Sequence, residues 1–420
     1  GGIKTKIKVA EENDISKVLI PATSLKNKTN ITNTSIDVIE VATLREVIKE
    51  FTGKSYGKED YELKINPQYN NIMENIATIM CNRTEILKNQ VKNYAPNSKV
   101  FNKIKNKTKS AEIAFNNSNY YPAASYCFST NIELGHELTK NLSDKKTLSE
   151  INDVKTAIER FEEMVDKKEI NTIPSLQTKI IVKERLLDAM ESLKEGHDKI
   201  EKNSSRYSLA YARERFHSAI IWSHFFNMSG KDIDLKQEQV RASCTNKIAE
   251  AEERLNYLRT ITLLPFNSTR EEITQAKFYR EQEEYEMCLF KANKAKSDID
   301  VTLSLIGIKE DSEVQGLIEA KLKYAERQIA REIEKDSFPI LGHSYYVYAK
   351  DLQETDPLSS LIYSELALEL SNMWPYFQTF DTREKIRLIN LNQDFLNGFL
   401  AGLIATIILV IILNKKKPHK

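Results

Sequence analysis

The chain has 420 residues, enough for two or three domains and at least one substantial core. Its 61 Lys and Arg against 60 Asp and Glu give a net charge of +1, which does not support a broad nucleic-acid-binding surface. With 41% apolar and 29% charged residues, it is neither an acidic disordered tail nor a protein with many membrane spans. Only 12 Gly and 10 Pro are present, too few for an all-β protein, so we expect a mainly α fold.

The first 53 residues have a pattern of their own. Residues 3–13 predict a short helix, and two β-branched runs, 15–21 (ISKVLIP) and 36–41 (IDVIEV), predict strands. Residues 43–52 (TLREVIKEFT) predict an amphipathic helix. Because this unit has too little chain to build a core alone, we expect residues 1–53 to be the end of an α/β domain that begins outside this chain.

Lys6 follows the glycine pair Gly1 and Gly2 at the start of the first predicted helix, and the first predicted strand ends in Ile20 and Pro21. This order of features resembles the end of the proteolytic domain of Lon-type proteases. In that family a Gly-Gly-apolar-x-x-Lys turn opens a helix, and an apolar strand ending in Ile-Pro follows. The resemblance covers residues 1–53 and implies a serine endopeptidase with a Ser/Lys dyad, in which Lys6 is the catalytic lysine and polypeptides are the substrates.

The nucleophilic serine of this family lies upstream of the lysine, and no serine between Gly1 and Phe51 corresponds to it. We therefore expect this chain to be the C-terminal part of such an enzyme, either a fragment or a product separated from its first half, and to be inactive alone. The chain also has no ATP-binding Walker loop. The resemblance thus implies the membrane-anchored, archaeal type without an ATPase domain, and no cofactor is expected.

The position of Lys6 suits a general base. A lysine accepts a proton only when its amine is neutral, which requires a pKa well below the ordinary value of about 10.4. Burial lowers the pKa of a lysine, and so does the partial positive charge at a helix N-terminus. A neutral Lys6 could then take the proton of a serine hydroxyl. The alternative is that the alternating run of Lys4, Lys6 and Lys8 is an ordinary solvated face.

Beyond a linker over residues 54–67, the apolar period becomes that of α-helices. Residues 68–390 predict an extracytoplasmic domain of long antiparallel helices, either a helical bundle or a short solenoid of helical hairpins. Capping boxes at Thr147 and Ser268 predict two helix starts. Helix breaks are expected at four prolines, Pro174, Pro265, Pro339 and Pro357.

The four cysteines show no CxxC pair, so a zinc site is not expected. Two disulfides between neighbouring helices are possible, most simply Cys81–Cys127 and Cys244–Cys288, because both sequence separations suit adjacent hairpin arms. Four buried free thiols are the alternative, and sequence alone allows three connectivities.

The six histidines predict no metal site. His136 is followed by Glu137 but has no second histidine four residues later, so this is not a zinc-protease motif. His217 and His224 lie seven residues apart on one helix face, without a clear third ligand, and we expect them to be core or interfacial residues.

Residues 395–413 (FLNGFLAGLIATIILVIIL) form a stretch of 19 residues without a charge. A helix of this length is about 28 Å long, close to the hydrocarbon thickness of a bilayer, so we predict one transmembrane helix. The basic tail 414–420 is expected in the cytoplasm and the preceding chain outside the cell membrane. Gly398 and Gly402 match a small-xxx-small motif and leave a homo-oligomer possible.

Ten Asn-X-Ser/Thr sequons agree with an extracytoplasmic location, because all of them precede the predicted span. The richness of the sequence in Asn can account for part of this number. The candidate glycosylation sites are Asn27, Asn30, Asn33, Asn82, Asn106, Asn116, Asn141, Asn203, Asn227 and Asn267.

Two functions of different classes fit these observations. The first is the C-terminal part of a membrane-anchored Lon-like serine endopeptidase, whose helical domain presents or restricts substrates. The second is a membrane-anchored helical module without catalytic activity, which binds a partner protein. A serine-bearing segment that precedes Gly1 or stays associated with the chain would favour the first hypothesis.

Overall fold

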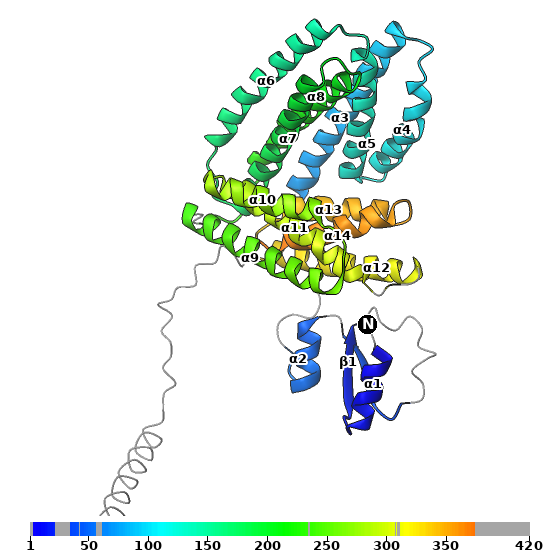
Figure 1. The fold of residues 1–420 in the computed structure, drawn as a ribbon, viewed down its shortest axis with the longest axis vertical. Helices are drawn as coiled ribbons and strands as arrows, with labels where there is room; N and C mark the ends of the chain where they lie inside the picture. Colours follow the sequence, from blue (N-terminus) through cyan, green and yellow to red (C-terminus); the bar gives the residue numbers. More distant parts are fainter. Residues whose placement is uncertain are drawn as a thin grey trace, which may run out of the picture. The chain divides into compact units, whose positions relative to one another are not determined.

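The computed structural model describes residues 3–373, except 22–33, 42, 56–60, 234–235, 307 and 309–310. The described residues are mainly α-helical, with helices α1 to α14 and two short strands. The expectation of a mainly α fold is therefore confirmed (Figure 1).

The N-terminal unit has the predicted order of elements, α1 (Ile3–Glu12), β1 (Lys17–Pro21), β2 (Asp37–Val41) and α2 (Leu44–Thr52). The strands pair in parallel, in a register that places Lys17 opposite Asp37 and Pro21 opposite Val41. Helix α2 begins where Thr43 Oγ1 accepts from the Glu46 backbone N–H, and it ends at Gly53, which adopts a left-handed φ of 68°.

The predicted fold class is wrong in its α/β part. The remnant of a Lon-type domain is not shown: the described sheet has only two strands, no residue of α2 is buried, and Leu44 and Phe51 are 74% and 72% exposed. Parallel sheets are normally covered by helices on both faces, and so short a unit cannot supply that cover. Among the described residues, no helix has the length and hydropathy of a membrane span. The predicted span 395–413 and the tail 414–420 lie outside the described residues.

The rest of the described chain forms a helical body. Its elements are α3 (Pro67–Tyr94), α4 (Val100–Asn116), α5 (Tyr120–Thr139), α6 (Asp144–Asp166), α7 (Ile173–Asp198), α8 (Ser204–Trp222), the 3-10 helix η2 (Ser223–Asn227), α9 (Gln237–Ile261), α10 (Asn267–Glu281), α11 (Tyr285–Leu305), α12 (Asp311–Ile333), α13 (Ile340–Leu352) and α14 (Pro357–Ser371).

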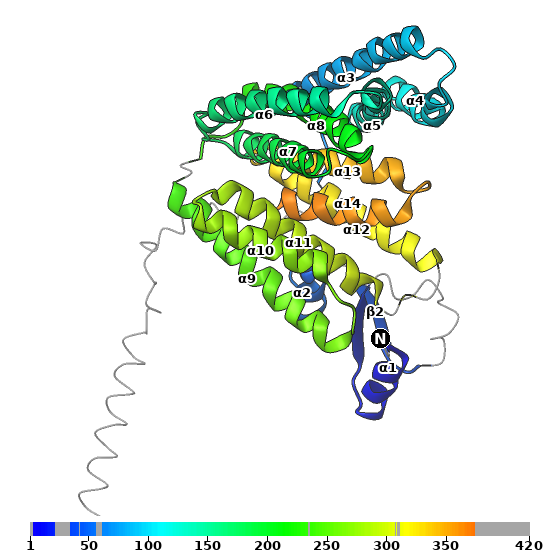
Figure 2. The same ribbon diagram turned by 45° about the horizontal axis from the view of Figure 1, so that its top comes forward.

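These helices form two neighbouring groups, α3 to α8 and α9 to α14 (Figures 1 and 2). Within the first group α3 packs on α5 and α7 on α8, and within the second α9 packs on α11 and α13 on α14. One apolar core runs through both groups and includes Tyr121, Leu176, Trp222, Cys288 and Leu341. The helices from α3 to α14 are therefore paired and share this core.

The predicted helix breaks at proline agree with the structure. Pro174 and Pro357 lie in the first turns of α7 and α14, Pro339 is the N-cap of α13, and Pro265 lies between α9 and α10. The predicted capping boxes do not agree with it. Thr147 lies inside α6, whose N-cap is Ser143, and that cap accepts a hydrogen bond from the Lys146 backbone N–H.

Ser268 is likewise not a cap. Helix α10 begins at Asn267, and its N-cap is Phe266, which makes no side-chain cap hydrogen bond. A Ser or Thr three residues before a Glu also occurs inside helices, so the capping-box pattern alone does not locate a helix start.

Candidate functional site

Lys6 lies near the start of α1 and its side chain is exposed. The next residue of the helix, Ile7, is buried. Among the described residues, no hydrogen bond or ion pair involves Lys6, and Gly1 and Gly2 lie outside them. Lys8, by contrast, pairs with Glu12 across one helical turn at 3.8 Å. The structure therefore places the predicted lysine on a helix as expected, but no described serine forms a hydrogen bond with it.

Topology places Lys6 at a particular end of the N-terminal unit. The four residues 13–16 connect α1 to β1, so the helix returns alongside the strand and the two run antiparallel. The start of α1 therefore lies at the end of the unit where β1 and β2 finish (Figure 1). In α/β proteins, functional groups commonly gather at the carboxyl ends of parallel strands.

Two polar contacts hold the helices of this unit to its strands. The Lys17 Nζ donates to Glu50 Oε2 at 2.8 Å, which ties β1 to α2 and raises the pKa of Lys17. The Ser35 backbone N–H and hydroxyl both donate to Glu11 Oε1 at 2.8 Å, which ties α1 to the residues before β2 and lowers the pKa of Glu11. No acidic residue stands in the first turn of α1, so none there pairs with Lys6.

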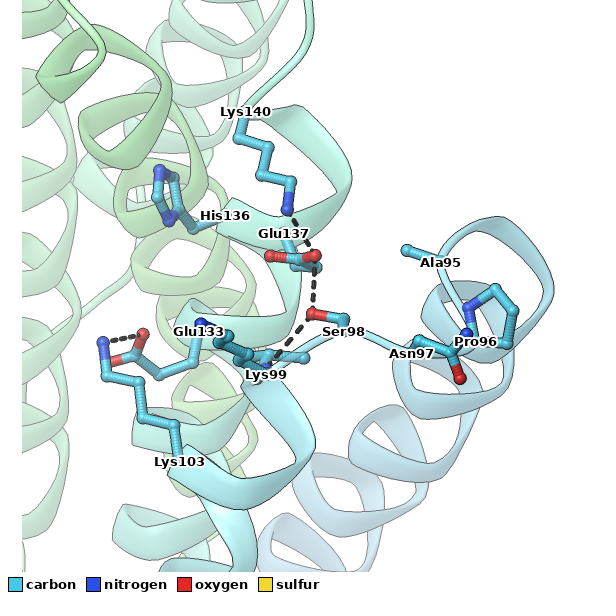
Figure 3. Close-up of a pocket in the computed structure, with 11 residues that line it drawn as sticks. Ala95, Pro96, Asn97, Ser98, Lys99, Lys103, Glu133, His136, Glu137 and Lys140 are labelled. Atoms are coloured by element: carbon cyan, nitrogen blue, oxygen red, sulfur yellow. Dashed lines mark hydrogen bonds and ion pairs between the residues drawn. The ribbon is translucent and has the colours of Figure 1, made fainter.

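An open pocket of about 670 Å³ lies between the α3–α4 turn and α5 (Figure 3). Here the Ser98 hydroxyl donates to Glu137 Oε1 at 2.6 Å and accepts from the Val100 backbone N–H at 3.1 Å. Lys140 Nζ donates to the same Glu137 oxygen at 2.5 Å. No sequence pattern connects Glu137 with Ser98, because 39 residues separate them and Ser98 lies in a turn.

This arrangement does not form a serine nucleophile with its base. Burial alone would raise the pKa of Glu137, but the hydrogen bonds from Lys140 and Ser98 keep it below its ordinary value. The pKa of His136 is lowered, chiefly by burial, yet its ring packs edge-on against Tyr207 and does not turn toward Ser98 (Figure 3). Ser98, Glu137 and Lys140 form a hydrogen-bonded cluster that connects the α3–α4 turn with α5.

The four cysteines are all paired, Cys81 with Cys127 between α3 and α5 and Cys244 with Cys288 between α9 and α11. The Cα atoms lie 5.1 Å and 5.7 Å apart, within the ordinary range for disulfides. This is the pairing that the sequence favoured, and it leaves no free thiol for metal binding or nucleophilic catalysis.

The sequon asparagines of the described residues all lie on the surface. The exposed ones are Asn82, Asn106, Asn116, Asn141, Asn203, Asn227 and Asn267. The other three, Asn27, Asn30 and Asn33, lie outside the described residues. The exposed side chains could accept a glycan without unfolding the body.

The two histidines that the sequence paired are not side by side in one regular helix. His217 lies in α8, where burial lowers its pKa and its Nδ1 has no hydrogen-bond partner, whereas His224 lies in the 3-10 helix η2. In the described part of the chain, neither belongs to a group of possible metal ligands.

One buried carboxylate cluster was not predicted. Asp300 of α11 and Glu365 and Glu369 of α14 bring oxygen atoms within 4.8 Å of one another. Lys296 bonds to both Asp300 and Glu369, and further cations surround the group; they are Lys247 on Glu369, Lys321 on Glu365 and Arg254 on Asp300. Because cations already occupy these oxygens, the cluster is an ion-pair network that joins helices, not a metal centre. The i,i+4 pairs Lys296–Asp300 and Glu365–Glu369 were its only sequence signal.

Comparison with known proteins identifies no relative: no family model matches the chain, and no curated protein and no solved structure shows a significant match.

Proposed function

We propose that this chain is the lysine-bearing, C-terminal part of a membrane-anchored Lon-like serine endopeptidase. The observation that carries the proposal is the place of Lys6, in the first turns of α1 at the end of the unit where the parallel strands β1 and β2 finish. The nucleophilic serine is supplied by chain upstream of Gly1. That segment covers the exposed amine of Lys6 and the uncovered face of α2 around Leu44 and Phe51.

The chemistry requires little from the described residues beyond this amine. Once the upstream segment excludes water from Lys6, the neutral amine accepts the proton of the serine hydroxyl as the serine oxygen attacks the peptide carbonyl. The resulting ammonium then returns a proton to the leaving amine, and water hydrolyses the acyl-enzyme by the reverse sequence of proton transfers. The helical body presents or restricts polypeptide substrates beside this dyad.

Two features of the helical body support an extracytoplasmic location, which the proposal also requires. The disulfides Cys81–Cys127 and Cys244–Cys288 are typical of oxidising compartments, although proteins of hyperthermophiles also contain them inside cells. The seven exposed sequon asparagines are accessible to modification. The anchor in this proposal is the apolar segment 395–413, followed by a cytoplasmic tail.

A second function is a membrane-anchored helical module that binds a partner protein without catalysis. The observation that favours it is the exposure of Lys6, which has no hydrogen-bond partner among the described residues. Under this alternative, the ion pairs and the core of the helical body only stabilise the fold that presents a binding surface.

The test uses the complete protein, including any segment that precedes Gly1, and an unfolded protein as substrate. Lys6→Ala should lower hydrolysis by about 10²–10⁴-fold without a change in helicity, because the general base is lost. Lys4→Ala is the matched control, since Lys4 is an exposed lysine on the same helix, and it should keep full activity. Equal activity of the two variants would reject the dyad, and an inactive complete protein would favour the binding module.

A further inference from the structure

Four exposed apolar residues lie close together in the sequence at the turn between α9 and α10. Leu263 is fully exposed, and Tyr257, Ile261 and Leu264 are 60%, 46% and 57% exposed. Other exposed apolar residues of the body, such as Met164 and Leu358, are isolated in the sequence and need no explanation. We call these four residues, Tyr257, Ile261, Leu263 and Leu264, the α9–α10 tip.

The residues of α9 and α10 next to the tip are buried and packed, whereas the tip itself is exposed. Leu255 and Leu258 of α9 are buried against Ile273 of α10 and Ile299 of α11, so the hairpin is firmly packed up to the tip. Phe266 packs partly against the same cluster and adopts a left-handed φ of 40°, which costs a non-glycine residue about 1–2 kcal/mol. This backbone turn anchors Phe266 inward while Leu263 and Leu264 stay in solvent.

The charged residues nearest to the tip are arginines. Residues 254–270 contain Arg254, Arg259 and Arg270, and the acidic pairs 252–253 and 271–272 lie directly outside this stretch. Arg254 is engaged by Asp300, whereas Arg259 and Arg270 are exposed at either side of the tip. Exposed leucine, isoleucine and tyrosine side chains with an arginine beside them are typical of segments that enter the headgroup region of membranes.

We infer that the α9–α10 tip inserts its apolar side chains into the interface of a lipid bilayer. This inference rests on the membrane-anchor part of the proposed function and not on its peptidase part. The apolar segment 395–413 starts 23 residues after Asn372 at the end of α14, and such a length of chain reaches up to about 80 Å. Helix α9, which leads to the tip, is about 37 Å long and therefore shorter than this upper limit. A contact between the tip and the bilayer, in addition to the proposed anchor, would restrict how the helical body is oriented at the membrane.

The sequon at Asn267 gives a first test. Asn267 is the first residue of α10 and is exposed three residues after Leu264. A glycan on Asn267 would keep the tip in water, so the inference requires this sequon to be unmodified in the native protein, whatever occurs at the other candidates. Mass spectrometry of the peptide that contains Asn267 should find free asparagine, and quantitative modification would overturn the inference.

The second test places a fluorescent probe at the tip of the full chain. Because all four native cysteines are in disulfides, Leu263→Cys introduces a single reactive thiol for a polarity-sensitive dye. Lys155→Cys, on the exposed face of α6, is the matched control. Both proteins are reconstituted into vesicles of equal parts phosphatidylcholine and phosphatidylglycerol, and binding is verified by flotation.

The expected result is a blue-shifted emission at position 263 that lipid-attached nitroxides quench, with a water-like, unquenched emission at position 155. Ile261→Asp with Leu264→Asp in the labelled protein should abolish the blue shift while flotation persists. A water-like probe at position 263 on floated vesicles would overturn the tip contact and leave the anchor intact. Failure of the chain to float would overturn both the anchor and the inference, and self-association that protects position 263 without lipid would assign the tip to a second copy instead.

Discussion

Arg83 of α3 holds the carboxylate of Glu214 of α8 in a two-pronged ion pair, with Nε and Nη2 at 2.6 Å and 2.5 Å from the two carboxylate oxygens. The Glu214 side chain is only 2% exposed, so the pair fixes the packing of α3 on α8 inside the first helical group. The contact raises the pKa of Arg83, which keeps the guanidinium charged at any ordinary pH.

Arg83→Met should therefore destabilise the protein strongly. The substitution leaves the Glu214 carboxylate buried without a partner, which typically costs about 3–5 kcal/mol of unfolding free energy in urea denaturation. Arg83→Met combined with Glu214→Leu should recover most of the loss. The control is Lys88→Met, because Lys88 pairs with the exposed Glu85 and should lose less than about 1 kcal/mol. Equal losses of unfolding free energy in Arg83→Met and Lys88→Met would show that the buried pair contributes no more than the exposed one.

Gly342 is predicted to tolerate no side chain. A Cβ at this position of α13 would lie 2.0 Å from Ser371 Oγ and 3.0 Å from the Ser371 backbone nitrogen of α14. Because backbone cannot move aside as a side chain can, Gly342→Ala should cost about 1–3 kcal/mol. Gly135→Ala is the matched control: its nearest contact would be 3.6 Å, and the better helix propensity of alanine should stabilise α5 by up to about 1 kcal/mol. Thermal unfolding of the two variants should thus shift in opposite directions, and a shift in the same direction would contradict the packing of α13 on α14.

His343 should make the protein sensitive to acid. Its ring is 3% exposed among Tyr69, Phe338 and Tyr346, and burial lowers its pKa from 6.5 to about 4. The folded state therefore holds the neutral ring, while the unfolded state binds a proton below about pH 6.5. Stability should fall as the pH drops from about 6.5 to about 4, by a total of up to about 3 kcal/mol.

The measurement is the unfolding free energy of the protein and of His343→Leu at several pH values in this window. His343→Leu should have a shallower pH dependence, whereas the exposed His197→Gln should follow the original protein. An unchanged pH slope in His343→Leu would mean that other groups dominate the acid response.

The disulfides should be intact in the native protein and should add to its stability. A denatured, unreduced sample is expected to show no free thiol, and Cys244→Ala should expose one thiol, at Cys288. Loss of either cross-link should lower the unfolding free energy by about 2–4 kcal/mol, since each closes a loop of more than 40 residues. A free thiol at Cys127 in Cys244→Ala would instead indicate a different connectivity.

Local patterns predicted the elements of this fold better than its contacts. The order α1, β1, β2 and α2 follows from β-branched runs and from the amphipathic segment 43–52, because each signal acts over a few residues. Proline positions were equally informative, since the ring excludes the helix interior wherever it occurs. The cysteine pairing was the one long-range contact that the sequence favoured, because only four candidates had to be combined.

The contacts between distant helices could not be predicted. Glu369 meets Lys247 across 122 residues and Lys296 across 73, and nothing in the local pattern distinguishes these lysines from solvated ones. The same limit applies to Lys6, whose partner under the proposed function would come from chain outside this sequence. For the N-terminal unit, short-range signals predicted the elements but not whether they close into a covered domain.

The most direct test of the proposed function is to label the nucleophile itself. The complete protein is treated with a fluorophosphonate that reacts with activated serines, and the labelled residue is mapped by mass spectrometry. The proposal predicts one labelled serine upstream of Gly1, with labelling lost in Lys6→Ala and retained in Lys4→Ala. Absence of label from the folded, complete protein, or a label whose yield does not depend on Lys6, would contradict it.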